Sequence, residues 1–72
     1  MTSHDSVTVM ANGTALTLPS GSTVGDLAKR FGLSENAILV ECNGEALFRT
    51  EWPNQALSEG DRIEFIRMVA GG

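Results

Sequence analysis

Two glycines carry the clearest chemical signal in this sequence. Gly71 and Gly72 end it, and a strand-like segment, residues 62–68, runs almost directly into them. Glycine has no Cβ, so a Gly-Gly end can lie extended in a narrow channel that excludes side chains. The α-carboxylate of Gly72 is then a reactive group on a thin stalk. We expect residues 69–72 to form a flexible tail whose C-terminus is chemically modified; the simpler alternative is a frayed chain end.

The other chemically capable side chains predict no active site. His4 is the only histidine, and it lies in a polar N-terminal segment, residues 1–5, that we expect to be flexible and solvated. Cys42 is the only cysteine, and no basic cluster lies near it in the sequence to activate its thiol. Its spacing from Ile38 and Val40 instead predicts a core position. We find no phosphate-binding glycine loop and no carboxylate pair suited to acid–base catalysis.

Length and composition narrow the class of protein. The 72 residues predict one domain spanning residues 1–72, and 42% hydrophobic with 19% charged residues is typical of a globular chain. A net charge of -4 argues against nucleic acid as a partner. One cysteine excludes an intrachain disulfide and a cysteine-based zinc site. Because neither a signal peptide nor a membrane-spanning run is visible, we expect a cytoplasmic protein with no membrane partner.

Periodicity and turn residues predict two hairpin strands, one helix and further strands. Asn12-Gly13 between two alternating runs is typical of a β-hairpin. Thr23 can cap the start of the helix, and Gly32 can end it. The expected elements are strands 6–10 and 14–18, helix 22–32, strands 37–42 and 47–48, an irregular connection or single helical turn at 49–55, and strand 62–68.

The order of these elements predicts an α+β fold. The helix has a single apolar stripe, so one face of a sheet can cover it. The final strand is long and apolar, and we expect it at the centre of the sheet, parallel to the first. This arrangement is the β-grasp, or ubiquitin-like, roll: a mixed sheet of four to five strands, one helix packed across it, and a C-terminal tail that leaves the sheet.

The outer face of the final strand is unusually apolar. Ile63 and Phe65 share one face, whereas Ile66 and Met68 lie on the opposite face. These outer residues either fill the back of a small sheet or form a docking patch beside the tail, and exposed apolar patches often mark protein partners. The expected docking patch comprises Ile66, Arg67, Met68 and Val69, with Arg62 at its rim and Ala70 and Gly71 in the adjoining tail.

Four segments together carry a resemblance to a known family. They are Ser22-Thr-Val-Gly-Asp-Leu27, Val40-Glu-Cys-Asn-Gly-Glu45, Leu57-Ser-Glu-Gly-Asp-Arg-Ile-Glu64 and Gly71-Gly72. In this order, over nearly the whole chain from about Val7, they resemble the sulfur-carrier protein of thiamine biosynthesis. The small sulfur-carrying subunit of molybdopterin synthase shares the fold and ending, but it is usually longer and has proline near the tail. Here Ala70 precedes Gly-Gly, where many thiamine-type members have a third glycine.

The resemblance implies a carrier that is a substrate of other enzymes and not an enzyme itself. An activating enzyme of the ubiquitin-activating type, using ATP and magnesium, would adenylate the Gly72 carboxylate. A sulfur donor, such as an enzyme that bears a persulfide, would displace AMP and leave a thiocarboxylate on Gly72. Thiazole synthase would then take the sulfur. The carrier itself would bind no cofactor or metal and would be a monomer when alone.

Other functions remain open at this point. The chain could carry sulfur for molybdopterin, cysteine or another sulfur-containing metabolite. It could also be a ubiquitin-like modifier joined to lysines, or a β-grasp module that only binds. A binding module would keep its function without Gly71-Gly72, whereas both kinds of carrier would lose it.

Overall fold

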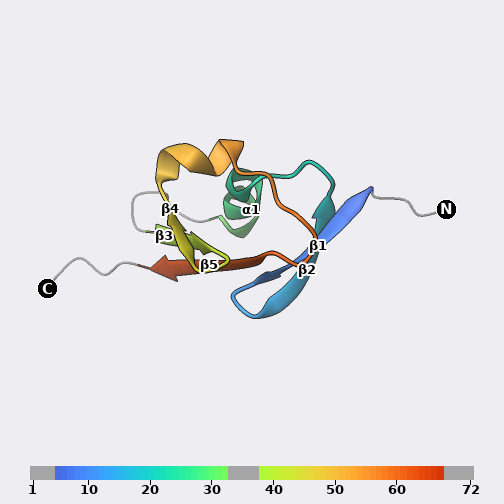
Figure 1. Ribbon diagram of the computed structural model, residues 1–72, viewed down its shortest axis with the longest axis horizontal. Coiled ribbons are helices and arrows are strands. Elements are labelled where there is room, and N and C mark those ends of the chain that lie inside the picture. The colour runs from blue at the N-terminus through green and yellow to red at the C-terminus, as the bar shows by residue number, and fades with distance from the viewer. Residues whose placement is uncertain (1–4, 33–37, 68–72) are drawn as a thin grey trace, which may run out of the picture.

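A computed structural model describes residues 5–32 and 38–67 as a mixed five-stranded sheet beside one α-helix and one 3-10 helix (Figure 1). The elements are β1 Ser6–Ala11, β2 Thr14–Pro19, α1 Val24–Phe31, β3 Ile38–Cys42, β4 Glu45–Leu47, η2 Arg49–Asn54 and β5 Arg62–Arg67. The strand order is β2-β1-β5-β3-β4, with β1 and β5 parallel and the other neighbours antiparallel. This confirms the predicted β-grasp roll and the central position of the final strand.

Helix α1 has the predicted capping residues, Thr23 and Gly32, and is slightly shorter than the expected helix 22–32. The Thr23 hydroxyl accepts a hydrogen bond from the Asp26 amide at 3.1 Å, and the Asp26 carboxylate accepts one from the Thr23 amide at 3.0 Å. Gly32 ends the helix in the left-handed conformation, with φ of 67°. Gly25 lies inside the helix because a Cβ there would stand 3.3 Å from the Pro53 Cα. The glycine therefore lets α1 lie close against η2.

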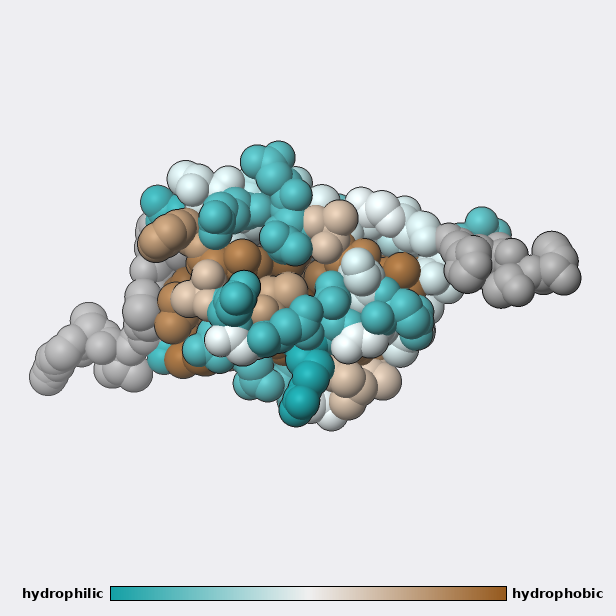
Figure 2. All heavy atoms as spheres, in the orientation of Figure 1, coloured by the Kyte–Doolittle hydropathy of each residue, from teal (hydrophilic) through white to brown (hydrophobic). Residues whose placement is uncertain are grey.

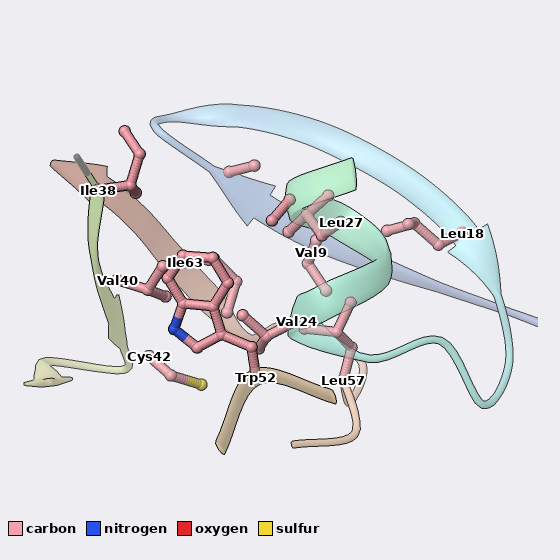
Figure 3. Close-up of a cluster of buried hydrophobic side chains, with 12 residues drawn as sticks. Val9, Leu18, Val24, Leu27, Ile38, Val40, Cys42, Trp52, Leu57 and Ile63 are labelled. Atoms are coloured by element: carbon pink, nitrogen blue, oxygen red, sulfur yellow. The ribbon is translucent and has the colours of Figure 1, made fainter. Parts of the chain in front are cut away.

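The core lies between the sheet and the two helices. Figure 3 shows its side chains converging from the strands, from α1 and from the segment that carries Trp52. The core residues are Val9, Ala11, Leu18, Val24, Leu27, Ala28, Ile38, Val40, Cys42, Trp52, Leu57 and Ile63. Trp52 is the largest of them, is only 2% exposed and anchors η2. Its indole N–H finds no hydrogen-bond acceptor within the described ranges.

Some strands begin or end at other residues than predicted. β1 extends to Ala11 and β2 to Pro19, each one residue beyond its expected end. β4 spans Glu45–Leu47 and not 47–48, because the Asn43-Gly44 turn starts pairing with β3 at once. Phe48 therefore lies outside the sheet and is 77% exposed.

Candidate carrier tail and docking surface

β5 is the strand that leads into the candidate tail. It pairs with β1 on one side and with β3 on the other, and its last residue is Arg67. Of the predicted site residues, the structure describes Ile66 and Arg67, both exposed on β5, and Arg62 at the start of the strand. The others lie outside the described residues and stay predictions: Met68, Val69, Ala70, Gly71 and Gly72.

An asparagine side chain fixes the end of β5 nearest the tail. The β1–β5 ladder itself pairs only Met10 with Arg62 and Ala11 with Ile63. Beyond it, the side-chain oxygen of Asn12 accepts a hydrogen bond from the Phe65 amide at 2.7 Å, and its Nδ2 donates to the Phe65 carbonyl at 3.4 Å. The side-chain amide of Asn12 therefore takes the place of a backbone partner for β5 beyond the end of β1.

A second asparagine holds the other end of β5 in a similar way. The side-chain oxygen of Asn43 accepts a hydrogen bond from the Arg62 amide at 2.9 Å, and its Nδ2 donates to the Asp61 carboxylate at 3.0 Å. Asn12 and Asn43 both adopt positive φ, 49° and 53°, as the first residue of their turns. The sequence pattern predicted only a hairpin turn at Asn12-Gly13. The fixing of β5 by the two asparagines was missed, because it depends on which strand lies beside each turn.

The two faces of β5 differ as predicted. Ile63 is fully buried and Phe65 is partly buried against the core, whereas Ile66 is 38% exposed on the opposite face. Figure 2 shows an apolar band between the helical layer and the sheet, bordered by hydrophilic side chains. Ile66 instead belongs to the open face of the sheet, beyond that band. Its exposure makes it available to a partner.

Two like charges meet on the open face of the sheet. Glu41 on β3 and Glu64 on β5 are direct cross-strand partners, so their side chains lie on the same face. They line a shallow hollow of about 400 Å³ together with Asn43, Gly44 and Arg62. Within the described ranges, neither glutamate side chain forms a hydrogen bond or an ion pair. Like charges in direct opposition destabilise a sheet.

Replacing one of these glutamates is therefore expected to stabilise the domain. Glu64→Lys places opposite charges across the β3–β5 pair and should raise the free energy of unfolding by roughly 0.2–1 kcal/mol. Urea unfolding at low and high salt measures the change, which salt should reduce. Glu45→Lys is the matched control, because Glu45 lies opposite Cys42 and not opposite a second carboxylate. Equal gains from both variants would contradict this explanation.

Cys42 is a core residue, as predicted, and not a nucleophile. Its side chain is buried on the inner face of β3. Burial raises the pKa of the thiol above its ordinary value, and the nearby carboxylates of Asp61 and Glu45 raise it further. The thiol therefore stays protonated at neutral pH, and only the thiolate is an effective nucleophile.

The raised pKa of Cys42 predicts a pH dependence of stability. Above about pH 9, the unfolded state releases the thiol proton while the folded state still holds it. The free energy of unfolding should therefore decline as the pH rises from there through the higher pKa of the folded state. Urea unfolding between neutral pH and pH 10 measures this decline, which should be smaller in Cys42→Ala. An identical decline in Cys42→Ala would show that the pH dependence of the free energy of unfolding comes from other titratable groups.

The described part of the chain shows neither a metal-binding cluster nor a membrane-spanning helix. No three His, Cys, Asp or Glu residues within residues 5–32 and 38–67 are grouped so that they could hold a metal ion. Neither helix in those ranges is long and apolar enough to cross a bilayer.

Comparison with known proteins agrees with this arrangement. The model of the ThiS family matches residues 5–72. A thiamine biosynthesis protein (ThiS) from Geobacter metallireducens has a similar solved structure, with a TM-score of 0.78 and 26% identity over 92% of this chain and 100% of that one. A computationally designed protein based on human erythrocytic ubiquitin is also similar, with a TM-score of 0.51 and 25% identity over 94% of this chain and 96% of that one. No curated protein is similar enough to count as a match.

These likenesses confirm the ubiquitin-like fold and the family that the sequence resembles. The family match covers all five strands and α1, and it extends through the terminal Gly71-Gly72. The chain belongs to the ThiS family, whose members are small ubiquitin-like carrier proteins and not catalysts.

Proposed function

We propose that this protein is the sulfur carrier of thiamine biosynthesis and carries sulfur as a thiocarboxylate on Gly72. The observation that supports this most strongly is the family match, which runs from the folded domain through Gly71-Gly72. The two glycines follow closely on Arg67, the end of a central and well-anchored strand. A thin chain end beside a rigid body suits delivery of a reactive group into another protein's active site.

The chemistry requires activation of the C-terminus. A carboxylate is a poor electrophile until one of its oxygens becomes part of a good leaving group. In the proposed first step, a Gly72 oxygen attacks the α-phosphate of ATP, pyrophosphate leaves, and an acyl-adenylate forms. Hydrosulfide can then attack the carbonyl carbon, displacing AMP and leaving the thiocarboxylate. If an enzyme persulfide attacks instead, an acyl disulfide forms, and a further thiol must reduce its S–S bond to release the thiocarboxylate.

This chain's own contribution is position and recognition. The predicted tail carries the reacting carbon. The predicted docking residues, Ile66 to Val69, would contact the partner enzymes, with Ile66 on the open face of β5 and Arg67 on the opposite face. An adenylyltransferase of the ubiquitin-activating type would bind the ATP and magnesium, and thiazole synthase would receive the sulfur. These steps would take place in the cytoplasm. No side chain of the carrier is required as an acid, a base or a nucleophile.

The identity of the sulfur acceptor tests the assignment to thiamine. The thiocarboxylated chain is incubated either with thiazole synthase and its substrates or with the large subunit of molybdopterin synthase and its precursor. We expect the chain to return to the carboxylate only with thiazole synthase, together with formation of the thiazole. Sulfur transfer only to the molybdopterin precursor would replace thiamine with that second pathway and keep the carrier chemistry.

A further inference from the structure

A groove of about 600 Å³ opens beside the end of β5 that leads into the tail. Its walls come from the β1–β2 hairpin, the end of α1, the start of β3 and the end of β5. We name it the tail groove; the lining residues that matter here are Thr14, Leu16, Phe31, Ile38, Phe65 and Arg67. Its lining is largely apolar, and it lies on the helical side of the sheet, away from the open face that carries Ile66.

The groove is built from rigid elements and leaves an aromatic ring exposed. Phe31 is 41% exposed, although it lies on the apolar face of α1. Its ring packs edge-to-face on Phe65, with ring centroids 5.4 Å apart. The Phe65 backbone is in turn fixed by the Asn12 side chain. A preformed apolar hollow with an exposed aromatic wall is typical of a site that receives an anchoring side chain.

The short distance along the chain between the groove and Gly72 indicates which partner binds at the groove. Arg67 lines the groove, and Gly72 is only five residues further along the chain. Five residues span at most about 18 Å. An enzyme that acts on the Gly72 carboxylate must therefore place its own surface within that distance of the groove. The activating enzyme is the one partner that the proposed chemistry cannot omit, since the carboxylate is unreactive before adenylation.

The charge of the tail groove indicates which kind of side chain the activating enzyme places beside it. The guanidinium of Arg67 is the only charged group among the described residues that line the groove. It is a cation on a chain of net charge -4. A partner carboxylate is its natural complement, because arginine and carboxylate groups form bidentate hydrogen bonds. We propose that the activating enzyme inserts an apolar side chain into the tail groove and pairs a neighbouring carboxylate with Arg67. This inference rests on the proposed sulfur-carrier function.

Blocking the groove tests this proposal. Thr14 is exposed, so Thr14→Arg obstructs the groove without removing a core side chain. The readout is ATP–pyrophosphate exchange by a thiamine-type activating enzyme, with KM and kcat measured for the carrier. We expect Thr14→Arg to raise KM about tenfold, and Arg67→Glu to do the same, with kcat nearly unchanged. The matched control is Thr50→Arg, an identical change at an exposed position on η2, which should leave KM unaltered.

The possible failures can be told apart. If the wild-type chain supports no exchange with any thiamine-type activating enzyme, the proposed function fails. If the wild type is active but either Thr14→Arg or Arg67→Glu keeps the wild-type KM, the docking proposal is overturned. It is overturned equally if Thr50→Arg raises KM as much as Thr14→Arg does. Thermal unfolding of each variant confirms that it is folded under the assay conditions.

Discussion

Deletion of Gly72 is expected to abolish thiocarboxylate formation while leaving the fold intact. The proposed reaction takes place at the carboxylate of this residue, and a chain that ends at Gly71 presents its carboxylate one residue short. The described core ends at Ile63, nine positions before Gly72 in the sequence. The free energy of unfolding should therefore change by less than about 0.5 kcal/mol. Intact mass after activation, together with urea unfolding, measures both effects.

A deletion at the other end of the chain is the matched control. Removal of Thr2 also shortens the chain by one residue, but at the opposite end of the sequence. This control should give the wild-type yield of thiocarboxylate. A normal yield from the Gly72 deletion would exclude the carrier mechanism. Equal losses from both deletions would show that the assay responds to chain length and not to the C-terminal group.

Replacement of Ile63 by alanine is expected to cost a large part of the domain's stability. Ile63 is fully buried at the centre of the sheet, on the strand between β1 and β3. Truncation of such a side chain removes buried apolar surface and leaves a cavity, which costs about 2–5 kcal/mol. Small domains have unfolding free energies of only about 5–15 kcal/mol, so this loss approaches the whole stability of a marginal domain. Urea unfolding monitored by Trp52 fluorescence measures the change.

Ile66→Ala is the matched control, because it is the identical substitution on the opposite face of the same strand. Ile66 is 38% exposed, so its truncation should cost less than about 1 kcal/mol. It should instead raise the KM for the activating enzyme if the open face docks a partner. Equal destabilisation by the two variants would contradict the assignment of faces on β5. An unchanged KM in Ile66→Ala would remove this residue from the predicted docking patch.

Local sequence signals were enough to predict most of the fold. Asn12-Gly13 and the alternation around it predicted the first hairpin, and Thr23 and Gly32 predicted the ends of α1. The central position of β5 was predicted from its length and its apolar residues, and its pairing with both β1 and β3 confirms that position. These features depend on neighbouring residues, so they can be read before the fold is known.

Features that depend on contacts between distant segments were not predicted. Trp52 lies in a segment whose sequence indicated only a connection or a turn, and its burial results from the packing of η2 over the sheet. The Asn12 bonds to Phe65 join residues 53 positions apart. The opposition of Glu41 and Glu64 depends on the register of β3 against β5. Of the candidate site, sequence predicted the Gly-Gly end and the exposure of Ile66, but not the tail groove.

Intact mass of the full chain tests the central claim most directly. The chain is incubated with a thiamine-type activating enzyme, ATP, magnesium and a sulfide source. The account predicts the exchange of one oxygen for one sulfur, dependent on ATP and located in the C-terminal peptide that contains Gly72. An unchanged mass with a panel of such enzymes, each active on its own carrier, would contradict it.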